Sequence, residues 1–292
     1  MWVSCHLFSS MEDYDSAQVM EMALFILFLT DVSKVQQFVL LKSMLCSCTF
    51  FLHAKLYTLF LFSVIPQPLA NWPLNHEHGL NDISGHDLHL ELMAGTVNTS
   101  TDPVTDQEFI YLDGTFQARV NHAGALQLTG DYTVFVAVSS LHLGYVFGYG
   151  GTATNYREIS MYMHDSLSHF YWHCSPACTH GVLQNNFFNK GVWNYVAVTF
   201  DSTNGKLKLF KNGQHFETFD VTADLSTGTD DGYLYIGKHG SESGVHLHTP
   251  ELYGRLACLQ IYDQVLSTAQ IQKLIIDCKA RRNPLESKYH VS

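Results

Sequence analysis

Residues 191–214 carry the clearest alternation of apolar and polar positions in the chain. Within residues 193–200, odd-numbered and even-numbered positions point to opposite faces of an extended strand, and both sets are largely apolar. A strand that is apolar on both faces is typical of a sandwich interior, where a layer covers each face. This segment is therefore predicted to be a deeply buried strand.

The next segment predicts a hairpin. Residues 206–210 read Lys-Leu-Lys-Leu-Phe, which places Leu207 and Leu209 toward a core and the two lysines in water. Asn212-Gly213 follows directly, and this dipeptide favours a type I′ turn because that turn needs a positive φ at both central residues. The pattern indicates an all-β unit.

Other short strand candidates lie between turn-forming Gly, Asn, Asp and Thr residues, at a spacing that favours a sandwich over alternating strands and helices. These candidates are residues 88–93, 109–112, 132–138, 143–149, 158–163 and 169–172. One helix is predicted near the carboxyl end, where Ser267 and Gln270 form a capping box and Leu266 and Ile271 a hydrophobic staple.

Residues 1–70 differ from the rest of the chain. Their apolar runs are interrupted by Lys42, His53 and Lys55, so none reaches the roughly 20 apolar residues that a membrane helix needs. Residues 56–65 have the length of a signal-peptide core, and Ala70 suits cleavage before Asn71. We therefore expect secretion, with a signal peptide within residues 44–70.

This interpretation puts the translation start at or near Met44 and treats residues 1–43 as an upstream extension of doubtful reality. The alternative is a signal anchor that uses residues 44–65 as one membrane helix, in which case the protein stays at the cell surface. In both cases residues 71–278 are expected to form the folded domain, and residues 279–292 a polar tail.

The charge balance excludes one class of partner. The 292-residue chain is 46% apolar and carries a formal net charge of −11. Nucleic-acid binding depends on clustered Lys and Arg, so nucleic acid is not an expected partner. The 17 histidines are scattered along the chain and are expected to be solvated or hydrogen-bonded.

Several segments resemble the laminin-G-like and pentraxin-like domains of the concanavalin A-like lectin/glucanase superfamily. The resemblance rests on the hairpin region at 193–213, the Tyr-Leu-Tyr-Ile-Gly-Lys run at 233–238, the last strand and helix at 253–271, and the opening at 72–85. It implies a jelly-roll β-sandwich over residues 71–278 with one short carboxyl-terminal helix.

Four cysteines follow residue 70, an even number that suits an oxidising compartment. A Cys258–Cys278 bridge would join the last strand to the helix, and a Cys174–Cys178 bridge would close a small loop. The alternative at Cys174 and Cys178 is a zinc site that includes the flanking histidines, although the spacing matches no strong zinc pattern. Asn98-Thr-Ser100 is a glycosylation sequon in a secreted protein.

Catalysis is not expected. The glycoside hydrolases of the superfamily need two carboxylates on either side of the scissile bond. Glu91 and Glu158 have no acidic partner at strand spacing, and the adjacent Asp230 and Asp231 are better explained as part of a turn. A divergent glycoside hydrolase is the alternative.

Binding through exposed aromatic side chains is the leading functional hypothesis. Aromatic faces stack on sugars or pack against a partner protein, and the alternative for each ring is core packing. The candidate ligand-binding residues are Tyr145, Tyr149, Tyr156, Tyr162 and Trp172. We expect a non-catalytic extracellular recognition or adhesion module for a glycan or an extracellular protein. A purely structural matrix component is a further alternative.

The resemblance also implies a possible structural calcium site, because some relatives bind Ca²⁺ through loop oxygens. Asp82 and Asp263 match acidic positions of such relatives and are the candidate ligands. The alternative is that both are turn and cap residues, with Asp82 in an Asx-turn. The two-calcium ligand set of the pentraxins is not recognisable.

Overall fold

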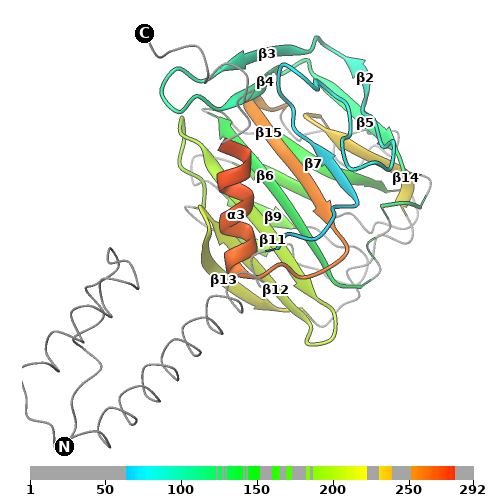
Figure 1. Ribbon diagram of the computed structural model, residues 1–292, viewed down its shortest axis with the longest axis vertical. Coiled ribbons are helices and arrows are strands. Elements are labelled where there is room, and N and C mark those ends of the chain that lie inside the picture. The colour runs from blue at the N-terminus through cyan, green and yellow to red at the C-terminus, as the bar shows by residue number, and fades with distance from the viewer. Residues whose placement is uncertain are drawn as a thin grey trace, which may run out of the picture. The chain divides into compact units, whose positions relative to one another are not determined.

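The computed structural model describes residues 64–122, 124–126, 128, 130–140, 142, 144–151, 160–164, 169–172, 182–184, 187–221, 230–238 and 251–279. The chain divides between Leu61 and Phe62, and every described residue belongs to the second unit. Within the described ranges, no helix has the length and apolar character needed to cross a membrane. The described part is a sandwich of two antiparallel sheets (Figure 1).

The first sheet has eight strands among the described residues. Seven of them follow one another across the sheet, and β1 (Ala70–Trp72) pairs with β15 beside this path. In spatial order they are β13 (Gln214–Asp220), β12 (Lys206–Lys211), β11 (Asn194–Asp201), β6 (Tyr132–Ser140), β15 (Tyr253–Tyr262), β4 (Glu108–Asp113) and β3 (Asn98–Thr101).

The second sheet has seven strands in the described part of the chain. Their order is β10 (Val182–Gln184), β9 (His169–Trp172), β8 (Ser160–His164), β7 (Gly144–Gly151), β14 (Asp230–Ile236), β5 (Gln117–Asn121) and β2 (Glu91–Ala94). The predicted jelly-roll sandwich is therefore confirmed.

Strand β11 is covered on both faces, as its pattern predicts. Val196 and Val198 are fully buried in the core between the two sheets. Tyr195 and Ala197 face the other way and belong to a second, smaller core. The hairpin is also confirmed, because Lys211 pairs with Gln214 and the two residues between them have φ values of 53° and 77°.

Helix α3 (Thr268–Lys279) covers the second core (Figure 1). The capping box is formed: the backbone N–H of Ser267 donates to Oε1 of Gln270 at 2.8 Å, and the N–H of Gln270 donates to Oγ of Ser267 at 3.3 Å. The buried helix residues are Ile271, Leu274, Ile275 and Cys278. They pack on the outer face of the first sheet, so this sheet is covered by the helix as well as by the second sheet.

A β-bulge redirects Cys258 toward the helix. The register of β15 with β6 shifts between Ala257 and Gln260, and Cys258 has a φ of 52°, a conformation that costs a non-glycine residue about 1 kcal/mol. Ala257 and Cys258 consequently both lie in the core beneath the helix. The predicted Cys258–Cys278 disulfide is confirmed, with a Cα–Cα distance of 5.9 Å.

The sandwich begins earlier than the sequence suggested. Ala70 is fully buried and pairs with Ile261, and the backbone N–H of Leu69 donates to the carbonyl of Ile261 at 2.8 Å. Ile65 packs against the core beneath α3. Leu69 and Ala70 thus contact the sandwich directly ahead of the expected domain start at Asn71, which stays a prediction.

Candidate functional site

The outer face of the first sheet, opposite the second sheet, divides into two parts. One part, called here the covered half, lies beneath α3 and comprises Phe109, Phe135, Ala137, Tyr195 and Ala257. The other, called here the open face, comprises Asn98, Tyr111, Tyr253 and Arg255. Tyr111 and Tyr253 are each 45% exposed, whereas the covered Phe109 is 5% exposed.

The strand register brings the open-face side chains together. Arg255 of β15 lies directly opposite Tyr111 of β4, and Tyr253 lies opposite Asp113. Directly opposite residues of an antiparallel pair share a face, and diagonal neighbours lie about 7–8 Å apart. Tyr111, Tyr253 and Arg255 therefore form one continuous patch.

Two neighbours orient the ring of Tyr253. A Cβ atom at Gly114 would lie 2.1 Å from Cζ of Tyr253, so the ring rests directly on the backbone of this turn, where Gly114 has a φ of +82°. The ring of His142 approaches Tyr253 edge-on, with the centroids 6.0 Å apart and an interplanar angle of 74°. The Tyr253 ring is thus supported on one side and exposed on another.

Asp102 fixes Arg255 at the boundary between the two parts. Its Oδ1 accepts hydrogen bonds from the backbone N–H groups of Val104 and Thr105 at 2.9 and 3.0 Å. Its Oδ2 pairs with Arg255 and accepts a bond from Nε1 of Trp193 at 3.3 Å. Burial alone raises the pKa of this carboxyl, but the two amides and Arg255 hold the pKa of Asp102 below its usual value.

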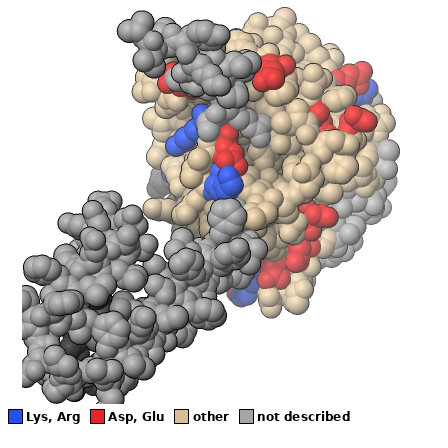
Figure 2. All heavy atoms as spheres, viewed as in Figure 1, with Lys and Arg blue, Asp and Glu red and all other residues tan. Residues whose placement is uncertain are grey.

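The resulting arrangement suits recognition rather than proton transfer. Asp102 remains ionised, and the guanidinium of Arg255 also lies over the ring of Phe109, at 5.2 Å from its centroid. Arg255 is therefore a positioned cation whose side chain is 38% exposed, next to two exposed tyrosine rings. In Figure 2 the described Lys and Arg side chains of the viewed face are separate spots, so that face offers no basic patch for a polyanion.

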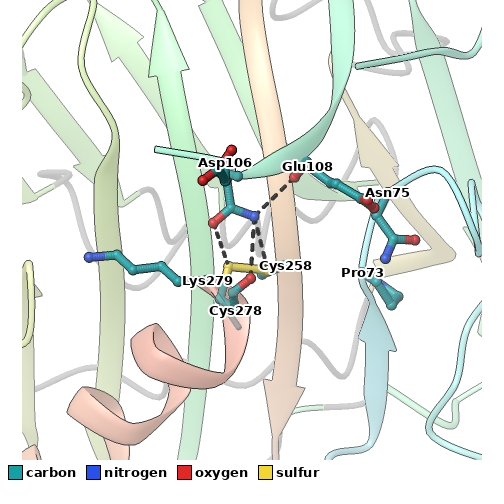
Figure 3. Close-up of a pocket in the computed structure, with 8 residues that line it drawn as sticks. Pro73, Asn75, Asp106, Glu108, Cys258, Cys278 and Lys279 are labelled. Atoms are coloured by element: carbon teal, nitrogen blue, oxygen red, sulfur yellow. Dashed lines mark hydrogen bonds between the residues drawn. A yellow bond between two sulfur atoms is a disulfide. The ribbon is translucent and has the colours of Figure 1, made fainter. Parts of the chain in front are cut away.

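A shallow pocket lies at the carboxyl end of α3, with the disulfide among the residues that line it (Figure 3). Gln107 is 3% exposed there, and its Nε2 donates to the carbonyls of Glu108 at 2.9 Å and Cys278 at 3.4 Å. Its Oε1 accepts from the hydroxyl of Tyr195 at 3.3 Å. Burial and the nearby Asp102 raise the pKa of Tyr195 to about 12, so this hydroxyl stays protonated. The hydrogen bonds of the Gln107 side chain thus join the carboxyl end of α3 to the first sheet.

The predicted aromatic candidates lie on the second sheet or outside the described residues. Tyr145 and Tyr149 of β7 are 1% and 0% exposed, so their rings contribute to packing and not to an open binding surface. Tyr162 of β8 pairs with Tyr145, and Trp172 of β9 pairs with Val182, but the side chains of Tyr162 and Trp172 are outside the described part. Tyr156 also lies outside it.

The two predicted calcium ligands have different surroundings. Oδ1 of Asp82 accepts from the backbone N–H groups of Asn71 and Ser84 at 2.8 and 2.9 Å. Its Oδ2 accepts from the Ser84 hydroxyl at 2.7 Å and the Leu88 N–H at 3.1 Å. The bond from Ser84 N–H is the Asx-turn of the alternative interpretation. These bonds hold the pKa of Asp82 below its usual value, against the opposing effect of burial.

Asp263 is exposed and directly follows β15. Within the described ranges, no three His, Cys, Asp or Glu side chains are grouped as metal ligands. Cys174 and Cys178, with their flanking histidines, lie outside the described residues.

Glu91, considered above as a lone acid, faces a cation. Its Oε2 lies 3.2 Å from Nε of Arg119, and the Arg119 guanidinium lies 4.5 Å from the ring centroid of Tyr233. This environment differs from the paired carboxylates that glycoside hydrolysis requires. Glu158 lies outside the described residues.

Sequence reasoning did not identify the open face. A signal was present at the start of the last strand, where Tyr253 and Arg255 occupy alternate positions before the apolar run at 256–259. Period-two alternation places both side chains on one face. The partner residues Asp102 and Tyr111 come from other strands or loops, and no local pattern links them to β15.

Comparisons with known proteins agree with the fold. The family model described as the concanavalin A-like lectin/glucanases superfamily matches residues 112–272, more than half of the chain. Part of the chain is similar to the Sushi, von Willebrand factor type A, EGF and pentraxin domain-containing protein 1 of Rattus norvegicus, at 30% identity over 94 residues. These residues are 31% of this chain but 3% of that relative, and the Mus musculus protein matches to the same extent.

Solved structures with low sequence identity share the fold. Domain 4 of AbnA, a GH43 extracellular arabinanase from Geobacillus stearothermophilus solved in complex with arabinotriose, has a TM-score of 0.51 and 18% identity, covering 71% of this chain and 98% of that one. The binding domain of botulinum neurotoxin DC in complex with rat synaptotagmin II has a TM-score of 0.51 and 13% identity, covering 73% and 52%. The chain belongs to the concanavalin A-like lectin/glucanase superfamily, in its laminin-G-like branch.

Proposed function

We propose that this chain is a non-catalytic extracellular recognition module that contacts an extracellular protein or a glycan through the open face. The observation that carries the proposal is the patch of Tyr111, Tyr253 and Arg255, in which two half-exposed rings flank a guanidinium held by Asp102. Tyrosine and arginine, with tryptophan, are the residues enriched among those that dominate binding energy at protein interfaces.

The patch lies on the outer surface of a sheet, and this favours an extracellular protein as the partner. Small ligands are usually held in concave sites that bury most of their surface, whereas protein partners bind broad surfaces with a few aromatic and arginine anchors. Because the Asp102 interaction already orients Arg255, binding loses less side-chain entropy at this position.

A glycan is the second candidate ligand. The structural neighbour solved with arabinotriose has the same fold, and tyrosine rings stack on the apolar faces of sugars. A protein partner and a glycan would contact the same side chains of the open face, so one set of variants tests both ligands.

The test uses the full chain produced through a secretory host. Binding to an extracellular protein library and to a glycan array is compared for the wild type, Tyr253→Ala, Arg255→Ala and the control Phe216→Ala. Phe216 is 37% exposed and lies on β13, at the opposite edge of the same sheet from β3. We expect Tyr253→Ala and Arg255→Ala to weaken binding roughly 10-fold or more, as at interface hot spots, and Phe216→Ala to leave it unchanged.

Equal binding by all four proteins would contradict the assignment of the open face. Release of sugar from a glycan substrate would contradict the non-catalytic role and favour the divergent hydrolase. A protein that binds nothing in either format would favour a structural matrix component.

A further inference from the structure

Asn98, the acceptor of the sequon, belongs to the open face. It is exposed on β3, which ends the first sheet among the described strands, and it lies directly opposite Tyr111 of β4. Directly opposite residues of an antiparallel pair share a face, with Cβ atoms about 4.5–5.5 Å apart. The sequon therefore places a glycan attachment point next to a half-exposed aromatic ring.

The local hydrogen bonding also suits this attachment. Nδ2 of Asn98 donates to Oγ1 of Thr96 at 2.8 Å. A glycosylated amide keeps one N–H, so the bond to Thr96 is compatible with a sugar on the same nitrogen. Ser100, the hydroxyl residue of the sequon, is exposed as well.

Two exposed features of this sheet edge would be shielded by a group attached at Asn98. Among the described strands, β3 has a hydrogen-bonded neighbour on one side only, and natural proteins block such edges against pairing with another chain. Tyr111 exposes 45% of its surface two positions from the buried Phe109. A bulky polar group anchored at Asn98 blocks the edge, and its first sugar lies within reach of the Tyr111 ring.

We propose that Asn98 carries an N-linked glycan whose first N-acetylglucosamine packs on the ring of Tyr111 and stabilises the β3–β4 edge. This inference rests on the extracellular location in the proposed function. In the linkage step Nδ2 of Asn98 bonds to the anomeric carbon of a lipid diphosphate-linked oligosaccharide. The carbon–oxygen bond to the diphosphate breaks, the lipid diphosphate leaves, and the amide loses one proton.

The packing leaves the other half of the open face accessible. Tyr253 and Arg255 lie on β15, on the side of β4 away from β3. The glycan therefore covers the Tyr111 ring, and a partner engages the part of the patch that stays accessible, Tyr253 and Arg255, which are the two residues that the binding test replaces.

The test is a cycle that combines sequon removal with loss of the ring. The full chain is secreted from a eukaryotic host as wild type, Ser100→Ala, Tyr111→Ala and the double variant, and the mass of the peptide containing Asn98 reports glycan occupancy. Removing the glycan from the wild type is expected to raise the unfolding equilibrium constant about 3- to 10-fold, the range of an aromatic stacking contact. The same removal in the Tyr111→Ala background is expected to have little effect.

Tyr253→Ala is the matched control, because Tyr253 has the same exposed fraction but lies opposite Asp113 and not Asn98. In that background, glycan removal should have the full wild-type effect. Enzymatic trimming to a single N-acetylglucosamine should retain the stabilisation, since only the first sugar contacts the ring.

An unmodified Asn98 peptide in the secreted protein would overturn the proposal. So would an equal effect of glycan removal with and without the Tyr111 ring. Either result leaves the Tyr253→Ala and Arg255→Ala binding tests intact, so a failure here is distinguishable from a failure of the recognition function.

Discussion

Phe109 and Tyr111 lie two positions apart on the same face of β4, yet one is 5% and the other 45% exposed. The same contrast occurs on β15, where Ala257 is fully buried and Tyr253 is 45% exposed. The alternation along each strand places these positions on the same face and predicts no difference in their exposure. The difference arises because α3 covers one part of the outer face and ends before the other.

The two parts are consequently stabilised in different ways. The covered half is held by apolar burial, by the capping box and by the disulfide between β15 and α3. The open face is organised by one carboxylate, Asp102, that accepts bonds from two backbone amides, the Trp193 indole and Arg255. The covered half should therefore contribute mainly to stability and the open face mainly to binding.

The largest effect is expected from Leu274→Ala in the covered half. Leu274 is 2% exposed on the face of α3 that packs on the covered half, and truncating such a buried leucine costs about 2–5 kcal/mol of the free energy of unfolding. The control is Ile276→Ala, because Ile276 is 63% exposed on the same helix and should change stability by less than about 0.5 kcal/mol. Urea unfolding followed by tryptophan fluorescence measures both, and equal effects would show that α3 does not cover a core.

Removing the disulfide should have the next largest effect. Cys258 and Cys278 are 20 residues apart, and the chain-entropy model gives about 3 kcal/mol for a loop of this size. The double variant Cys258→Ser, Cys278→Ser avoids leaving a single thiol. Its free energy of unfolding should approach that of the wild type measured under reducing conditions. An unchanged free energy would show that the capping box and apolar burial suffice to dock the helix.

Asp102→Asn tests the boundary between the two parts. The substitution removes a charge that accepts hydrogen bonds, and we expect it to lower the free energy of unfolding by about 1–3 kcal/mol near neutral pH. Because the pKa of Asp102 is lowered in the folded protein, its contribution is present above the unfolded-state value of about 3.9 and is lost as the pH falls through the folded-state value. The difference from the wild type should therefore narrow below about pH 4. A constant difference between pH 3 and 7 would contradict the assigned role.

The smallest effect on stability is expected on the open face itself. Tyr253→Ala removes a half-exposed ring and should change the free energy of unfolding by no more than about 0.5 kcal/mol. The same variant is expected to weaken partner binding. A large loss of stability, seen as a lowered urea midpoint, would place Tyr253 with the covered half.

Local signals predicted the parts of the fold that depend on neighbouring residues. The turn at Asn212-Gly213, the capping box at Ser267 and Gln270 and the two apolar faces of β11 all follow from short-range chemistry. So does the Asx-turn at Asp82, which was the alternative to the calcium site proposed there. The disulfide between Cys258 and Cys278 was also predicted, from the strand and helix that contain them. The bulge that turns Cys258 toward the helix carries no such local signature.

Most residues of the candidate site could not be predicted from the sequence. Tyr145 and Tyr149 were proposed as ligand-binding residues, but their aromatic character is equally compatible with burial, and the structure buries them. Asp102 and Arg255 are 153 residues apart, and their pairing requires the loop between β3 and β4 to lie beside β15. Ile65, Leu69 and Ala70 pack on the sandwich, although their place in or just after the apolar run at 56–65 favoured a signal peptide.

The sequence by itself determined that this chain forms an antiparallel sandwich with one capped helix, because alternation, turn chemistry and capping act between residues close in the chain. The tertiary structure decided which of the apolar and aromatic faces remain open. A side chain becomes a binding surface when no other layer covers it, and this depends on contacts between residues more than 100 positions apart, such as Asp102 with Arg255.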